Sequence, residues 1–265
     1  MLRAMCQGDS FAIPRLGKPQ EVEQITPEAL YRHYKTLLRT SPVEIFYVGS
    51  AKPQALIQAL APLVENLKTE PMALPEQQLF TPAVARQECF EAMDIAQAKL
   101  SMGFYCGISY SDPDYAAAQV FNAIYGAGMT SKLFMNVREK LSLCYYANSS
   151  YYGAKGIMTV SSGIDEENYE SATAEILAQL DACRAGEVSQ AELDAAKTAI
   201  ISSLRTISDS PSALEGFYAT APIGGIPFSI REYMDAIQAV TVSDVQQVAN
   251  KMKHHTTYCL KGVAK

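Results

Sequence analysis

Two side chains near the end of a predicted helix, Arg138 and Tyr145, could do chemistry together. Hydrophobic residues recur at helical spacing through this segment: Leu133, Phe134, Val137 and Leu141. From Cys144 onward the residues favour a strand. A rigid helix–strand corner would hold a guanidinium and a phenol in fixed positions. The pair could then bind a developing oxyanion or a peptide carbonyl.

Both residues also have a purely structural interpretation. An arginine near a helix end often caps carbonyl groups or pairs with an acid such as Glu139, and a tyrosine that opens a strand usually packs in the core. Strand alternation puts Tyr145 and Tyr146 on opposite sides of a sheet, and the seven-residue spacing selects Tyr145 for a cleft. A functional pair should have its polar tips close together and accessible to solvent.

The block 126–145 carries a family resemblance. It reads Gly-Ala-Gly-Met-Thr-Ser-Lys-Leu-Phe-Met-Asn-Val-Arg-Glu-Lys-Leu-Ser-Leu-Cys-Tyr. This block resembles the second-domain signature of the pitrilysin/insulinase-type zinc metallopeptidases, the group that includes mitochondrial processing peptidase. The resemblance implies that Arg138 and Tyr145 are catalytic residues. They would reach across to a zinc site held by the other half of the molecule.

The same resemblance implies a zinc-binding His-x-x-Glu-His motif and a distal Glu. This chain has three histidines, His33, His254 and His255, and no such motif. His33 has no Glu-His partner and is predicted to lie on a solvated helix face. His254 and His255 are adjacent, so they cannot face one ligand, and they are predicted to be a surface pair. Because catalytic zinc needs three protein ligands, we expect no cofactor in this chain. Zinc would belong to a missing half or a partner subunit.

A helix–strand pattern occurs twice, in residues 22–49 and 237–262. Each copy has a threonine that can cap a helix, an amphipathic helix and a short apolar strand that ends in glycine. The closing glycines, Gly49 and Gly262, are 213 residues apart, so a repeat of that length would lack about 164 residues before Met1. The predicted strand 43–48 would then present an unpaired edge.

The order of predicted elements indicates an α+β fold. A strand over 98–109 is followed by a helix that Gly126 ends, a hairpin of 145–152 and 157–164, and helices over 168–184 and from the Ser189–Glu192 capping box. This order predicts a pitrilysin-like sandwich of a mainly antiparallel sheet with helices on one side.

Three segments follow from the repeat and the resemblance. Residues 1–70 are predicted to be the C-terminal remnant of a first pitrilysin-type domain. Residues 71–88 would be a linker, and 89–265 a complete second domain that carries the Arg/Tyr motif.

Composition excludes some classes of function. The net charge of −6 and the pI near 5.2 argue against nucleic-acid binding, and no apolar run is long enough to span a membrane. None of the six cysteines lies within three residues of another, so they are predicted to be core residues in the reducing cytoplasm. A homo-oligomer remains possible.

Together these features predict a component or fragment of a zinc-dependent metalloendopeptidase that acts on peptides and is inactive alone. Its partner would be a zinc-bearing pitrilysin-type subunit or a missing N-terminal half. Truncation and a natural non-zinc subunit both stay open. The alternative is a non-catalytic scaffold or peptide-binding subunit of a pitrilysin-type complex.

Overall fold

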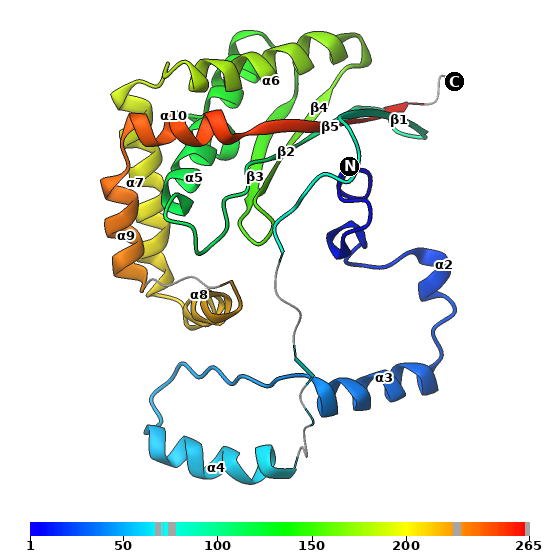
Figure 1. Cartoon of the computed structure of the whole chain (residues 1–265), viewed down its shortest axis with the longest axis vertical. Helices are drawn as coiled ribbons and strands as arrows, with labels where there is room; N and C mark the ends of the chain where they lie inside the picture. The colour runs from blue at the N-terminus through cyan, green and yellow to red at the C-terminus, as the bar shows by residue number, and fades with distance from the viewer. Residues whose placement is uncertain (67–69, 71, 74–77, 225–228, 263–265) are drawn as a thin grey trace.

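A five-stranded sheet with helices packed on one face dominates the computed structural model (Figure 1). The structure describes residues 1–66, 70, 72–73, 78–224 and 229–262. The strand order is β1-β5-β2-β4-β3. The strands are β1 (Gln87–Met93), β2 (Ala98–Tyr105), β3 (Tyr146–Tyr152), β4 (Ile157–Ile164) and β5 (Lys253–Gly262). Of the four strand pairs, β1 with β5 is parallel and the other three are antiparallel, which confirms the predicted α+β fold with a mainly antiparallel sheet.

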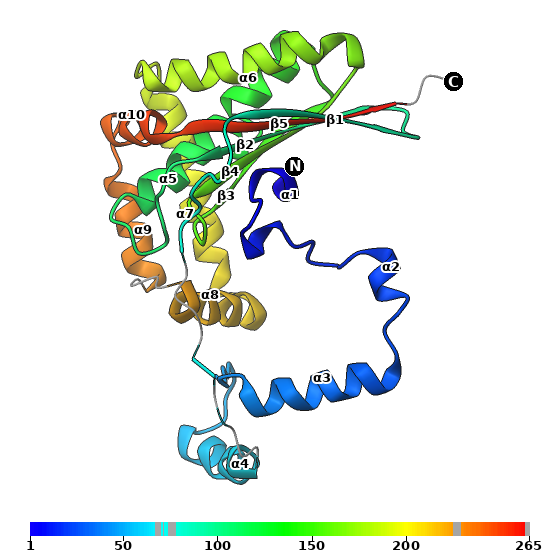
Figure 2. The same ribbon diagram turned by 45° about the vertical axis from the view of Figure 1, so that its right-hand side comes forward.

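The helices of the main body lie against one face of this sheet (Figures 1 and 2). They are α5 (Tyr115–Asn122), the π-helices η2 (Ala123–Ala127) and η3 (Leu133–Lys140), the short 3₁₀ turn η4 (Glu166–Asn168), α6 (Tyr169–Arg184), α7 (Gln190–Ile207), α9 (Ile230–Ala239) and α10 (Val242–Lys251). A further helix, α8 (Pro211–Gly224), packs on α7 and lies away from the sheet (Figures 1 and 2). Alternate residues of β2, Leu100, Met102 and Phe104, are buried in the core beneath them. The predicted capping box at Ser189 is present, and the threonine of the second repeat, Thr241, caps α10 with a capping box of its own.

A smaller core covers part of the opposite face of the sheet. The short helix α1 (Leu2–Met5) and the turn η1 (Ser10–Ala12) contribute to it, and Met5 packs with Phe80 and Ile157. The Met5 sulfur lies where a side chain at Gly103 would stand, so only glycine allows this approach.

The segment that follows α1 and η1 leaves the body of the protein. It contains α2 (Pro19–Val22), α3 (Pro27–Thr40) and α4 (Pro53–Asn66), and Figures 1 and 2 show α3 and α4 well away from the sheet. Thr26 caps α3 as expected, but α3 buries none of its residues. The predicted strand 43–48 was wrong, because residues 42–48 have neither helix nor strand. A strand needs a hydrogen-bonding neighbour, and the described residues give this segment none.

Other local predictions need correction. Gly126 does not end the helix, because η2 runs on to Ala127; the glycine instead allows close contact with Ser149 and Leu133. Leu141 follows η3 and is exposed, so it does not extend the apolar face. β1 was not predicted, and it begins at Gln87, inside the segment assigned as a linker.

The surface assignment of the adjacent pair His254 and His255 was also wrong. His255 is buried against Phe80 and Tyr105, and its Nε2 lies 2.9 Å from the Val84 carbonyl oxygen. His254 packs on the Phe104 ring. The register of β5 shifts at this point, so a bulge accommodates the pair. His33 is exposed on α3, as predicted.

The cysteines are free thiols, and Cys6, Cys144, Cys183 and Cys259 are buried as predicted, whereas Cys89 and Cys106 are only partly buried. Within the described ranges, no helix combines the length and apolar character needed to cross a bilayer.

Candidate functional site

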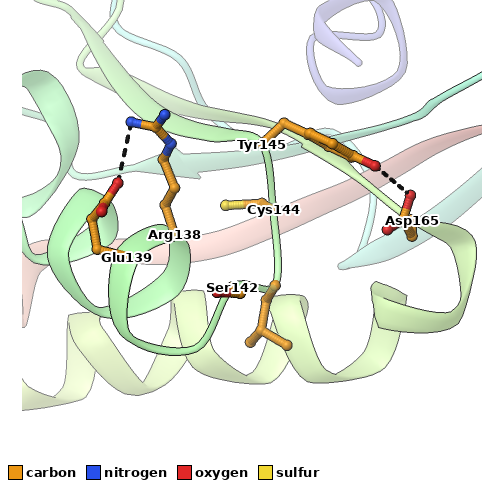
Figure 3. Close-up of a pocket in the computed structure, with 7 residues that line it drawn as sticks. Arg138, Glu139, Ser142, Cys144, Tyr145 and Asp165 are labelled. Carbon is orange, nitrogen blue, oxygen red and sulfur yellow. Dashed lines mark hydrogen bonds and ion pairs between the residues drawn. The ribbon is translucent and has the colours of Figure 1, made fainter.

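Arg138 and Tyr145 line the same pocket, which has a volume of about 430 Å³. The pocket lies where η3 ends and β3 begins (Figure 3). The other lining residues are Glu139, Ser142, Leu143, Cys144 and Asp165. The structure therefore brings the two predicted site residues together at one hollow of the surface.

Core packing and backbone hydrogen bonds fix the corner between η3 and β3. In η3, Leu133 and Val137 are buried in the core, which turns the next residue, Arg138, toward the surface. Ser142 then adopts a left-handed conformation with φ of 51°, and its amide donates to the Arg138 carbonyl at 3.1 Å. The Tyr145 amide donates to the Gly163 carbonyl at 2.8 Å, which fixes the start of the hairpin.

The Arg138 guanidinium pairs with its sequence neighbour. Its Nη1 is 3.4 Å from Glu139 Oε1, and it lies over the Phe134 ring at 4.7 Å from the centroid. The pairing with Glu139 is the one that the structural interpretation predicts. A guanidinium has five N–H donors, so this contact leaves others for a ligand.

Tyr145 is 58% exposed, so it is not a core residue. Its hydroxyl donates to Asp165 Oδ1 at 3.1 Å. This hydrogen bond, with the charge of the same carboxylate, raises the pKa of Tyr145, so the phenol stays protonated at neutral pH. Tyr146 does not line the pocket; it lies beneath Lys99, with the ammonium 5.3 Å from the ring centroid.

The two polar tips do not meet. Figure 3 shows the guanidinium of Arg138 turned toward Glu139 and the hydroxyl of Tyr145 turned toward Asp165. The structure therefore does not meet the criterion of adjacent tips that was set for a functional pair. Each group is engaged with a carboxylate of the chain itself, and a phenol has only one proton to donate.

Sequence reasoning missed Asp165. It lies 20 residues after Tyr145, and no motif links the two. The hairpin supplies the missing signal, because Tyr146 pairs with Gly163 in the β3–β4 register. A residue just before β3 must then lie near a residue just after β4.

The residues present do not fit a zinc ion. Among the described residues, no three His, Cys, Asp or Glu side chains come close enough to hold a metal. His254 and His255 bond instead to Thr257 and Thr256, at 3.0 and 2.7 Å.

The sequence of residues 24–200 matches the family model described as "Peptidase M16 inactive domain". The chain belongs to the M16 peptidase family. This finding confirms the resemblance drawn from residues 126–145.

Individual M16 relatives agree with this assignment. "Probable inactive metalloprotease YmfF" of Bacillus subtilis is 32% identical over 99% of this chain and 61% of its own length. The "Probable mitochondrial-processing peptidase subunit beta, mitochondrial" of Arabidopsis thaliana is 24% identical over 89% of this chain and 46% of its own length. The chain thus spans less than two thirds of the curated relatives it matches.

Solved structures share the fold. A conserved protein from Enterococcus faecalis superposes with a TM-score of 0.88 at 30% identity, over all of this chain and 63% of that one. The M16 inactive domain from Pseudomonas fluorescens gives a TM-score of 0.78 at 21% identity, over all of this chain and 64% of that one.

Proposed function

We propose that this chain is the Arg/Tyr-bearing component of an M16-type zinc endopeptidase that acts on peptides, and that it has no activity alone. The observation that carries the proposal is the pocket at the η3–β3 corner. There, Arg138 and Tyr145 stand at the surface on rigid elements, while the described residues offer no metal-binding group. Zinc would be bound by the partner or by a first half of a longer polypeptide.

Each side chain has a definite task in this proposal. Tyr145, a neutral donor at working pH, would donate to the oxyanion of the substrate, and Arg138 would hold a substrate carbonyl or carboxylate. One such donor is typically worth about 3 kcal/mol at the transition state. The Tyr145 hydroxyl must first leave Asp165, so substrate binding would have to turn the phenol toward the reacting carbonyl.

The proposal also assigns the segments of the chain. Residues 1–70 would complete a first M16-type domain, 71–86 would link it to the second, and 87–265 would be the second domain, since β1 begins at Gln87. Support comes from α3 and residues 42–48, which expose apolar side chains although their sequence pattern matches α10 and β5. The missing strands would come from the zinc-bearing partner or from a longer polypeptide.

The location is proposed to be cytoplasmic. All six cysteines are free thiols in the structure, which suits a reducing compartment.

The test is peptide hydrolysis by this chain mixed with a purified zinc-bearing M16 protein of the same organism. Tyr145→Phe should lower kcat roughly 100-fold with unchanged melting temperature. Tyr146→Phe is the matched control, because it removes a neighbouring hydroxyl outside the pocket, and it should leave kcat unchanged. Equal turnover by Tyr145→Phe and the parent mixture would rule out the catalytic role.

A second candidate is a scaffold or peptide-binding subunit without a catalytic role. It is favoured by the internal engagement of both side chains, since Arg138 pairs with Glu139 and Tyr145 bonds to Asp165. A stable complex with the zinc-bearing protein, in which neither Arg138→Gln nor Tyr145→Phe changes the cleavage rate, would support this candidate.

A further inference from the structure

Arg138 lies on an unusual type of helix. η3 is a π-helix of eight residues, Leu133–Lys140. π-helices are rare, usually last a single turn and often occur at functional sites. A helix of this kind needs help from its surroundings to keep one geometry, and two polar contacts outside the hydrophobic core supply it.

The first contact holds the beginning of η3. Lys132, the residue before the helix, is only 8% exposed, and its Nζ is 2.9 Å from Glu192 Oε1 at the start of α7. The second carboxylate oxygen of Glu192 accepts from the amide and the hydroxyl of Ser189, both at 2.8 Å. One carboxylate therefore caps α7 and anchors η3.

The Glu192 carboxylate in this contact is ionised at neutral pH. Burial alone would raise the pKa of Glu192, but Lys132 and Ser189 outweigh it, so the pKa lies below its ordinary value. Lys132 is buried, whereas the Glu192 side chain is 29% exposed, so removal of Lys132 would leave a partly solvated carboxylate without its cation.

The second contact holds the middle of η3. Asn136 Nδ2 donates to Gln179 Oε1 of α6 at 2.7 Å. Gln179 in turn donates to Glu175 Oε1, one turn earlier on α6, at 2.6 Å. This short chain of hydrogen bonds fixes the amide orientation of Gln179, so Asn136 meets a preset acceptor two residues before Arg138.

We infer that Lys132 and Asn136 are positioning residues that hold η3 against α7 and α6, and so set where Arg138 stands at the pocket. The catalytic part of this inference rests on the proposed function. The structural part does not, because it concerns how η3 is held in the free chain.

The experiment compares Lys132→Met with Lys197→Met. Lys197 is the matched control, because it is also a buried lysine, bonded to the Gln238 carbonyl at 2.9 Å on a different side of α7. Amide exchange of residues 133–143 is measured by mass spectrometry, relative to exchange in β2. Lys132→Met should speed exchange in 133–143 about tenfold, because loss of this charge-assisted hydrogen bond to Glu192 lowers the free energy of local opening. Lys197→Met should leave that ratio unchanged.

Two further variants keep the test decisive. Lys132→Arg retains the charge and should restore slow exchange. If Lys132→Met does not fold, Asn136→Ala provides the same measurement, with faster exchange expected in 133–143. Unchanged relative exchange in both Lys132→Met and Asn136→Ala would overturn the inference.

The catalytic arm uses the mixture with the zinc-bearing protein. Lys132→Met should lower kcat more than it raises KM, and Lys132→Arg should recover most of kcat. If Arg138→Gln lowers kcat but Lys132→Met does not, positioning is wrong and the proposed function stands. If Arg138→Gln has no effect, the proposed function fails. The exchange experiment alone then tests whether Lys132 and Asn136 hold η3 in place.

Discussion

The same helix–strand pattern occurs twice in this chain with opposite outcomes. Thr241 caps α10, which buries Val245, Val248 and Ala249, and β5 then pairs with a strand on each side. Thr26 caps α3 in the same way, yet α3 buries no residue and the following residues 42–48 form no strand. Caps and helices follow from local sequence, whereas a strand requires neighbours.

The unpartnered copy leaves many apolar side chains exposed. They are Leu30, Tyr31, Tyr34, Leu37, Val43, Ile45, Tyr47 and Val48. Soluble proteins rarely expose a continuous apolar surface without a function for it. In the proposed function, a sheet of the zinc-bearing partner or of a longer polypeptide would accept this segment as one of its strands.

The largest expected difference between the two copies is in core packing. Val248→Ala in α10, where the side chain is 1% exposed, should lower the free energy of unfolding by about 2 kcal/mol. Leu37→Ala in α3, where the side chain is 50% exposed, should change it by less than about 0.5 kcal/mol. Urea denaturation of both variants measures this. Similar losses would show that α3 is part of the cooperative core after all.

The two helix caps should differ by a smaller amount. Thr241→Ala removes the acceptor for the Asp244 amide, 3.3 Å away, and should cost about 1 kcal/mol of global stability. Thr26→Ala removes the equivalent acceptor for the Ala29 amide at 3.2 Å, but α3 does not share the core. It should therefore lower helix content by circular dichroism without moving the main urea transition. A shift of that transition in Thr26→Ala would contradict the comparison.

The smallest expected effect concerns His254 in β5, compared with His33 on α3. Burial, with Arg86 nearby, lowers the pKa of His254 from its ordinary 6.5 to about 4. The unfolded chain thus takes up this proton first, and stability falls as the pH drops from 6.5 through 4. The slope should be a few tenths of a kcal/mol per pH unit, because solvent screening reduces the roughly 1.4 expected for full burial.

His254→Gln should flatten this acid decline, measured by melting temperature between pH 7 and pH 4. The exposed His33 on α3 is the matched control, and His33→Gln should leave the decline as it is. An unaltered pH profile in His254→Gln would show that other groups cause the acid sensitivity.

The sequence predicts much of the body from β2 to β5 well, because the signals there are local. The hairpin of β3 and β4 and the capping boxes at Ser189 and Thr241 follow from turn and cap chemistry. β1 (Gln87–Met93) was not predicted. It is an edge strand that pairs in parallel with β5, far along the chain, and local sequence does not indicate such pairing. The burial of His255 was missed for a related reason, because it depends on a β-bulge in β5 and on contact with the distant Val84 carbonyl.

For the site, the sequence predicts the residues better than their partners. Arg138 and Tyr145 follow from spacing at a helix–strand corner, and both line the pocket. The turn of Tyr145 toward Asp165 depends on hairpin register, and the contact between Lys132 and Glu192 depends on how η3 packs on α7. Both contacts depend on tertiary packing, which the spacing of hydrophobic residues along the sequence does not predict.

Amide hydrogen exchange of the free chain, read by mass spectrometry, tests most directly the proposal that the first helix–strand copy pairs with strands from elsewhere. Residues 254–260 of β5, paired on both sides, should exchange slowly, and residues 43–48 should exchange at nearly the rate of an unfolded peptide. Addition of the zinc-bearing M16 protein should then protect 43–48. Slow exchange throughout 43–48 in a proven monomer would contradict the account.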